Sequence, residues 1–238
     1  MHRPAAIPDD EFNAPRRAPR FFAVSPHLDD AVLGCSTLLS LRSGAVVCTV
    51  FAGEPARPAR TPWDEAGGFA DSHEAMAARR EEDERALALW AARAVRLDFL
   101  DAQYGATPTV SAVADAIAAQ FERFASRTLV CPLGLWHSDH ELVGAACRSL
   151  LLTGRLRACI AYEDPIYRAI PGALSAGFAR LESQRLRASP LPLQPLAPRR
   201  AAAIKLRAVR AYGSQLRAFG SFPLDVARTE RYWRLERA

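Results

Sequence analysis

The feature that most constrains this chain is residues 21–34, where an apolar run ends at a proline and a histidine and two adjacent aspartates follow. Such a run, bounded by a turn signal and followed by helical spacing, is typical of a buried strand leading into a helix. Pro26 ends the predicted strand and favours an extended backbone at Ser25. His27 is therefore expected at the carboxyl end of a strand, where open α/β sheets bind ligands.

The two aspartates, Asp29 and Asp30, fall in the first turn of the predicted helix, which favours negative charge. Neighbouring carboxylates repel, so the pKa of one rises unless a cation lies beside them. A divalent metal held by His27 and one aspartate removes this conflict and leaves the other aspartate free for proton transfer. The alternative is a helix cap, the commoner role of an aspartate pair at a helix start.

A second junction of strand, loop and helix carries residues 135–140, which read Leu-Trp-His-Ser-Asp-His. With it, three of the five histidines of the chain lie at equivalent strand ends. Because parallel strands place these ends side by side, His27, Asp30 and His140 are predicted to converge on one ion. The alternative is that His137 and His140 only cap a helix or bond locally.

The two motifs resemble the signatures of the LmbE-like, or PIG-L-like, family of zinc-dependent N-acetylglucosamine deacetylases. The resemblance extends over roughly residues 20–217, with supporting matches at Gly53, Glu54, Arg79, Glu82, Ala86, Asp98, Asp101, Lys205, Ala208, Ser214 and Gln215. The chain departs from the family pattern at Leu28, Ala31, Trp90 and Tyr212. These departures concern the substrate and leave every expected metal ligand in place.

The resemblance implies a metal-dependent hydrolase that removes an acetyl group from the amide nitrogen of an N-acetylglucosamine-type conjugate. His27, Asp30 and His140 are expected to hold Zn²⁺, with Fe²⁺ as the alternative metal. Asp29 is expected to act as the general base toward the attacking water.

Five further residues complete the predicted site. His137 is expected to stabilise the oxyanion and to protonate the departing amine, and Asp139 to orient a histidine. The family pattern also suggests sugar contacts from Glu54, Arg79 and Asp101, although a surface ion pair or a turn is an equal alternative for each.

Two rival functions use the same residues. His27, Asp29 and His140 also have the composition of a two-histidine, one-carboxylate iron oxygenase site, which predicts an all-β fold. A relative that binds a sugar or nucleotide without converting it is the second rival.

The alternation of apolar strands with amphipathic helices predicts an α/β fold, a Rossmann-like three-layer α/β/α sandwich with a mostly parallel sheet in a single domain. Residues 1–19 are predicted to be a flexible arm and residues 20–238 the deacetylase domain. Predicted strands cover residues 21–27, 45–51, 95–99, 128–133 and 158–162, and predicted helices cover residues 29–42, 71–90 and 110–124.

The remaining segments are less regular. Residues 53–70 are expected to form a long loop beside the site, and residues 163–167 either to line the pocket or to form a turn. Residues 230–235 are expected to be an edge strand or a docked tail. No Gly-x-Gly-x-x-Gly turn follows the first strand, which disfavours dinucleotide binding.

Length and composition limit the class of protein to which the chain can belong. With 238 residues, half of them hydrophobic, the chain suits one well-buried domain. No apolar stretch approaches the length of a membrane span and the first twenty residues contain no apolar signal region, so a cytoplasmic protein without an integral membrane segment is expected. The five cysteines lack zinc-finger spacing and are predicted to be buried free thiols.

The net charge of +5 is carried almost entirely by arginine, because Lys205 is the only lysine. Residues 180–210 are the most basic part, which indicates a solvated face or a patch for an anionic substrate such as a phosphorylated sugar. Nucleic acid is disfavoured as a partner because no aromatic residues are interleaved there. The expected partner is a small amino-sugar conjugate, and a homo-oligomer is left open.

Overall fold

A computed structural model describes residues 21–41, 44–105, 107–126, 128–193, 195 and 197–238. The predicted arm at residues 1–19 lies outside the described residues. Seven strands form one sheet in the order β3-β2-β1-β4-β5-β7-β6. They are β1 (Phe21–Ser25), β2 (Val46–Thr49), β3 (Arg93–Arg96), β4 (Thr128–Pro132), β5 (Ala158–Tyr162), β6 (Leu186–Leu191) and β7 (Tyr232–Arg237).

The first five strands of the chain are parallel, and β7 runs antiparallel to both β5 and β6. Strand order turns back on the two sides of β1, since β2 pairs with one edge of it and β4 with the other. The carboxyl ends of β1 and β4 therefore open side by side at the point where open α/β sheets bind ligands. This confirms the predicted mostly parallel α/β sandwich.

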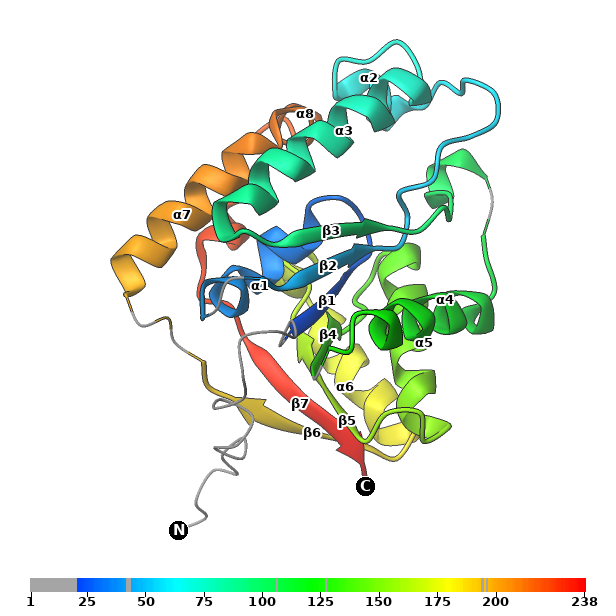
Figure 1. The fold of residues 1–238 in the computed structure, drawn as a ribbon, viewed down its shortest axis with the longest axis vertical. Helices are drawn as coiled ribbons and strands as arrows, with labels where there is room; N and C mark the ends of the chain where they lie inside the picture. Colours follow the sequence, from blue (N-terminus) through cyan, green and yellow to red (C-terminus); the bar gives the residue numbers. More distant parts are fainter. Residues whose placement is uncertain (1–20, 42–43, 106, 127, 194, 196) are drawn as a thin grey trace.

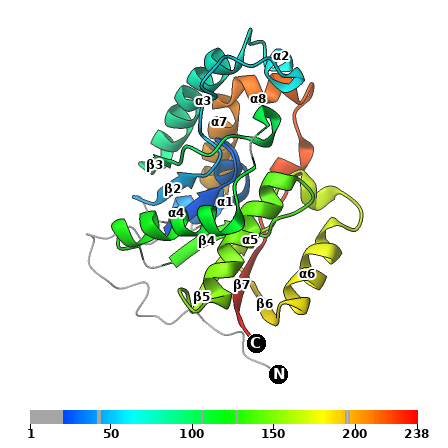
Figure 2. The same ribbon diagram turned by 90° about the vertical axis from the view of Figure 1, so that its right-hand side faces the viewer.

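Eight α-helices lie among the described residues. They are α1 (Asp30–Leu41), α2 (Pro62–Ala66), α3 (Ser72–Leu87), α4 (Val110–Arg123), α5 (Ser138–Leu152), α6 (Ala173–Ser183), α7 (Pro198–Ala211) and α8 (Gly213–Ala218). Figures 1 and 2 show α3 and α7 side by side on one side of the sheet, with α4 and α5 together on the other.

Alternate residues of the central strands serve the two helical layers. In β1, Phe22 and Val24 belong to the core under α4 and α5, whereas Phe21 and Ala23 belong to the core under α1, α3 and α7. All five residues of β1 are buried. A strand covered on both faces reads as a continuous apolar run, which is why the sequence pattern identified β1.

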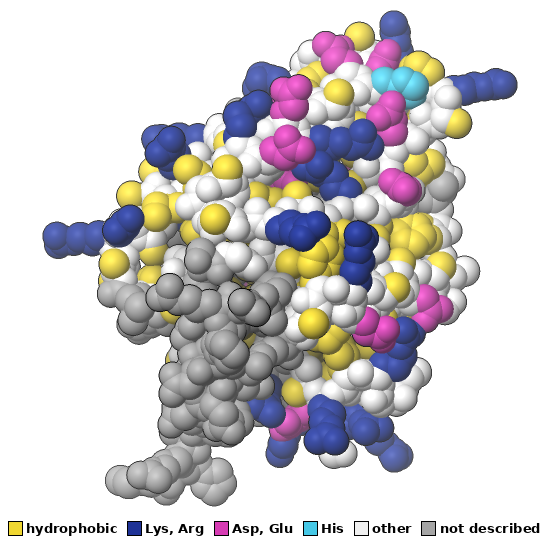
Figure 3. Space-filling model, in the orientation of Figure 1, with side chains coloured by type: hydrophobic (Ala, Val, Ile, Leu, Met, Phe, Trp, Pro, Cys, Tyr) yellow, Lys and Arg dark blue, Asp and Glu magenta, His cyan; other side chains and the backbone are white. Residues whose placement is uncertain are grey.

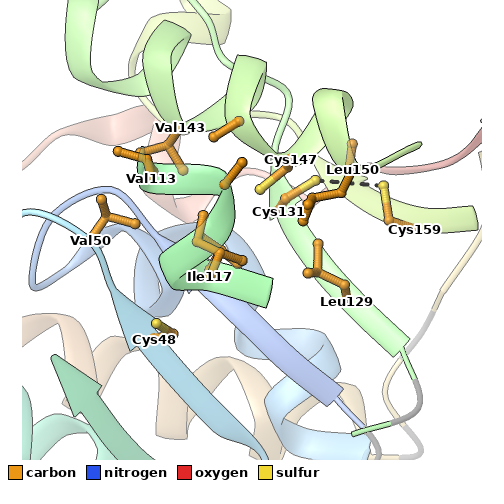
Figure 4. Packing of buried hydrophobic residues seen from close by; sticks show 14 of the residues in the cluster. Cys48, Val50, Val113, Ile117, Leu129, Cys131, Val143, Cys147, Leu150 and Cys159 are labelled. Carbon is orange, nitrogen blue, oxygen red and sulfur yellow. Dashed lines mark hydrogen bonds between the residues drawn. The ribbon is translucent and has the colours of Figure 1, made fainter. Parts of the chain in front are cut away.

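All five cysteines are buried free thiols, as predicted. Three of them, Cys131, Cys147 and Cys159, meet in the core between β4, β5 and α5, as Figure 4 shows. The Sγ atoms of Cys131 and Cys159 lie 3.8 Å apart. These thiols pack among Leu129, Val143 and Leu150 and act as small apolar side chains.

The third strand begins two residues earlier and ends three residues earlier than predicted. Beyond Arg96 the chain leaves the parallel ladder, because Asp98 forms a single antiparallel bridge with Phe51. The carbonyl of Phe99 then accepts the N–H of Gly53 at 3.0 Å. A Cβ at position 53 would lie 2.4 Å from the backbone oxygen of Asp98, so this close approach requires glycine.

The segment at residues 53–70 contains a short helix where a loop was predicted. Thr61 caps α2 by accepting the N–H of Asp64, and Pro62 occupies the first helical turn. The next helix, α3, begins with the predicted cap at Asp71, which accepts the N–H groups of His73 and Glu74. Both helix starts are therefore specified by local side-chain chemistry.

The chain end forms neither an edge strand nor a docked tail. β7 lies between β5 and β6, and β6 forms that edge of the sheet. The prediction was wrong because the buried Tyr232 and Leu235 lie three positions apart, so they do not show the alternation typical of a strand. The neighbouring β6 also lies in the segment that prolines interrupt.

Candidate metal and catalytic site

The loops after β1 and β4 bring the two histidine motifs together. The hydroxyl of Ser25 donates to the carbonyl of His27 at 2.6 Å and accepts the N–H of Ala31 at 2.9 Å, which shapes the turn into α1. His137 caps α5, with its Nδ1 accepting the N–H of Asp139 at 3.2 Å. Both motifs therefore end one element and begin the next through their own side chains.

One carboxylate oxygen lies at the centre of the predicted metal-ligand set. Oδ2 of Asp30 lies 3.2 Å from Nδ1 of His27 and 3.2 Å from Nε2 of His140, and it also accepts the backbone N–H of His27 at 2.8 Å. The candidate ligand atoms of these three residues lie within 4.8 Å of one another. The structure thus brings together side chains that are more than a hundred positions apart in the chain.

His140 is fully buried and is held from its far side. Its Nδ1 lies 2.6 Å from Oδ1 of Asp164, whose other oxygen accepts the N–H of Gly134 at 3.0 Å. A proton on Nδ1 leaves the lone pair of Nε2 facing Asp30. That Nε2 is a buried atom without a hydrogen-bond partner among the described residues.

His27 is oriented by two carboxylates on its other ring nitrogen. Nε2 of His27 lies 3.0 Å from Oδ2 of Asp139 and 3.8 Å from Oδ2 of Asp101. The same Asp139 oxygen accepts the N–H of Ala102 at 3.1 Å. Asp139 therefore contacts a histidine, and the histidine is His27.

The packing of these charges shifts their pKa values. Burial and, after it, the adjacent Asp30 carboxylate together raise the pKa of Asp29 to about 7. Burial opposes protonation of His27 and His140, but the surrounding carboxylates outweigh it, so the pKa of His140 rises to about 9 and that of His27 also rises. For Asp30 the two imidazoles outweigh burial and lower the pKa.

The donor set fits a divalent cation. Two imidazoles and a carboxylate are ligands that zinc accepts, and a cation among them would give the Nε2 of His140 the partner it lacks. His27, His137 and Asp139 form a second compact set. That set fits less well, because Nδ1 of His137 already accepts a backbone N–H and Oδ2 of Asp139 accepts another.

A cavity of about 570 Å³ opens beside these residues. Asp29 and His137 both line it, next to His27 and Asp30. Its other lining residues are mostly apolar or aromatic: Leu28, Leu33, Phe51, Trp63, Met76, Arg79, Asp101, Gln103, Trp136, Ile166, Tyr167, Tyr212, Gln215 and Phe219.

The three predicted sugar contacts lie in different surroundings. Asp101 lines the cavity and caps the short 3-10 helix Ala102–Tyr104. Arg79 lines the cavity too, but it is buried and its Nη2 lies 2.8 Å from Oδ1 of Asp64. Glu54 is not among the lining residues and forms an ion pair with Arg80 at 3.1 Å.

Asp164 is the residue of this site whose role the sequence analysis missed. It follows β5, so the rule that placed the two histidine motifs at strand ends also applies to it. The neighbouring Ile166 and Tyr167 line the cavity, and residues 165 and 166 form a turn, so each of the two alternatives for residues 163–167 holds for part of the segment. No described helix has both the length and the apolar character needed to cross a membrane.

Comparison with known proteins identifies the family of this chain. The family model of GlcNAc-PI de-N-acetylase, PIG-L, matches residues 22–151, more than half of the chain. No curated protein sequence matches it.

Among solved structures, the zinc-inhibited form of teicoplanin deacetylase superposes with a TM-score of 0.74 at 22% identity, covering 92% of this chain and 98% of that one. A triple mutant of a deacetylase of the teicoplanin biosynthetic pathway gives 0.70 at 27% identity with the same coverage. N,N'-diacetylchitobiose deacetylase from Pyrococcus horikoshii gives 0.53 at 17% identity, covering 91% and 76% of the two chains. With both signature motifs assembled beside one cavity and the family model matched, the chain belongs to the PIG-L, or LmbE-like, family.

Proposed function

We propose that this protein is a zinc-dependent N-deacetylase acting on an N-acetylglucosamine-type conjugate. The observation that carries the proposal is the single oxygen of Asp30 lying 3.2 Å from both His27 and His140, with Asp29 beside it in the cavity. Family membership supports a deacetylase, and the deacetylase neighbours share its fold.

His27, Asp30 and His140 would hold the metal, with Fe²⁺ as the alternative ion. When bound, zinc would lower the pKa of a coordinated water to about 7 and polarise an acyl carbonyl. Asp164 and Asp139 would orient the two imidazoles through hydrogen bonds to their outer nitrogens.

Asp29 would take the proton from the attacking water, because its carboxylate faces the cavity and accepts no hydrogen bond from the described residues. His137 would stabilise the oxyanion. Its Nδ1 accepts the N–H of Asp139, which leaves a neutral imidazole with its proton on Nε2 as a donor. Asp29 would then return its proton to the departing amine, which replaces the predicted protonation by His137.

The distribution of charge on the chain bears on whether the substrate is anionic. Lys and Arg side chains are scattered over the face in Figure 3 among acidic ones. Within the basic stretch, Arg180 pairs with Glu141, Arg187 with Glu236 and Lys205 with Glu230. These three cations already have carboxylate partners, which argues against their forming an anion-binding patch.

The test separates metal binding from turnover. Asp29→Ala should retain one metal per chain and lose release of acetate from an N-acetylglucosamine conjugate, whereas His140→Ala should lose both. His73→Ala is the matched control, because His73 lies outside the cavity and bonds to the carbonyl of Pro55. Equal loss of metal in the Asp29 and His140 variants would contradict the assigned roles, and an inactive but metal-loaded wild type would favour the non-catalytic rival.

The iron oxygenase rival predicted an all-β fold. The observed sheet carries helices on both faces, so that expectation is wrong. The cytoplasmic location and the oligomeric state stay predictions.

A further inference from the structure

A stacked aromatic pair at the cavity, formed by the exposed Trp136 and the partly buried Tyr167, has no part in the proposed deacetylation. Trp136 is 61% exposed, although it is among the largest side chains of the chain. Its ring lies 5.6 Å from that of Tyr167, with the two planes inclined by 24°. Because Tyr167 covers one face of Trp136, the arrangement leaves an open aromatic surface beside the reacting groups.

The backbone holds Trp136 outward at a conformational cost. Its φ is +60°, a value that bulky residues rarely adopt, and the N–H of His137 donates across it to the carbonyl of Leu135 at 2.6 Å. Strain of this kind persists where the surrounding structure imposes it, and it gathers at ligand sites. Trp136 directly precedes the predicted catalytic His137, so its position is tied to that of the site.

The partner ring is held in a second strained turn. Ile166 has a φ of +72°, and its N–H donates to Oδ2 of Asp225 at 2.9 Å. The same oxygen accepts Nε of Arg168 at 2.8 Å. The chain on either side of Tyr167 is thus anchored, which makes the stacked pair a rigid surface.

The two glutamine side chains that line the cavity are already engaged in hydrogen bonds. Gln103 accepts from Thr61 and donates to Asp101, and Gln215 accepts from the indole N–H of Trp63. A second sugar ring, which carries several hydroxyl groups, would find few available partners there. A cavity of about 570 Å³ lies in the range of about 300–1,000 Å³ typical of drug-sized ligands, so it has room beyond one acylamino sugar.

We infer that Trp136 is a specificity-determining residue that selects conjugates in which the acylamino sugar carries a flat, aryl-type aglycone. The aglycone stacks on the open face of Trp136 and continues the Trp136–Tyr167 stack. The inference rests on the proposed deacetylase function for the identity of the sugar.

The test compares kcat/KM for free N-acetylglucosamine, its phenyl β-glycoside and its β-linked disaccharide. The wild type should prefer the phenyl glycoside, and Trp136→Ala should lower the ratio of phenyl glycoside to free sugar by about tenfold, mainly through KM. Trp136→Phe, which keeps an aromatic ring at this position, should retain most of the wild-type ratio. Leu152→Ala, which truncates an exposed leucine at the far end of α5, is the matched control and should keep the ratio.

Calorimetric binding of the deacetylated phenyl glycoside separates the two proposals. Binding that Trp136→Ala weakens, in a wild type that releases no acetate, would refute the deacetylase and leave the stacking surface supported. Turnover with equal preference for all three compounds, or with preference for the disaccharide, would overturn the inference and leave the deacetylase standing. Absence of both turnover and binding would overturn both.

Discussion

His140 shows how the positions of single atoms define this site. Its Nδ1 meets Asp164 at 2.6 Å, and its Nε2 faces Asp30 without a hydrogen bond. The negative charge of Asp164 keeps the proton on Nδ1 and makes Nε2 a better ligand. Asp164 is fully buried, so it cannot exchange this contact for water without rearrangement.

We therefore expect Asp164→Asn to weaken zinc binding by about 10–100-fold, because a neutral amide supports the imidazole less strongly than a carboxylate does. Titration against a competing chelator measures the affinity directly. Asp115→Asn serves as control, since Asp115 lies on the surface in an ion pair with Arg155. An affinity equal to that of the wild type would show that Asp164 has no influence on the metal.

Some residues of the site could be predicted from the sequence, and others could not. His27, Asp30 and His140 were placed together because two parallel strand ends must adjoin. Asp164 follows a third strand end, but the proline after it made a turn an equal explanation. The partner of Arg79, the buried Asp64, lies in α2, which the sequence analysis treated as a loop.

At the scale of elements, a buried carboxylate just before β7 links that strand to α1 and α7. Glu230 accepts Nζ of Lys205 in α7 at 2.6 Å and the hydroxyl of Tyr232 at the start of β7. It also accepts the backbone N–H groups of Ser36 and Thr37 in α1. These contacts depend on tertiary structure, so local sequence patterns could not reveal that residues 230–235 lead into an internal strand.

Glu230→Gln should lower the free energy of unfolding at pH 7 by about 3 kcal/mol, because it leaves Lys205 without its buried partner. Burial alone would raise the pKa of Glu230, but Lys205 and the hydrogen bonds outweigh it and lower the pKa. A lowered folded pKa stabilises the protein above the unfolded value of about 4.3, and this contribution is lost as the pH falls through the folded pKa.

The difference between wild type and Glu230→Gln should accordingly narrow as the pH drops below about 4. Urea unfolding at a series of pH values measures it. Glu84→Gln is the control, since Glu84 is exposed and its pair with Arg96 should contribute under about 1 kcal/mol. A difference that stays constant down to acid pH would show that the charge of Glu230 does not provide the stabilisation.

For the whole molecule, the sequence pattern predicted the layers because each central strand faces two helical layers. Continuous apolar runs such as residues 21–25 are expected only where both faces of a sheet are covered. The antiparallel edge of β7 and β6 was not predicted, because buried and exposed residues do not alternate regularly in either strand and a proline lies within β6. The sequence therefore predicts the buried central strands better than the antiparallel edge of the sheet.

The site connects three strand ends, because His27 follows β1, His140 follows β4 and Asp164 follows β5. A metal bound there should stabilise the folded chain against unfolding, which would separate these ends. Free Zn²⁺ at about 100 times its Kd should add about 2.7 kcal/mol, or roughly 5–10 °C in the midpoint of thermal unfolding. His140→Ala should abolish this shift and His73→Ala should retain it in scanning calorimetry. An equal shift in both variants would mean that zinc binds elsewhere, and the strand ends would then be held by hydrogen bonds alone.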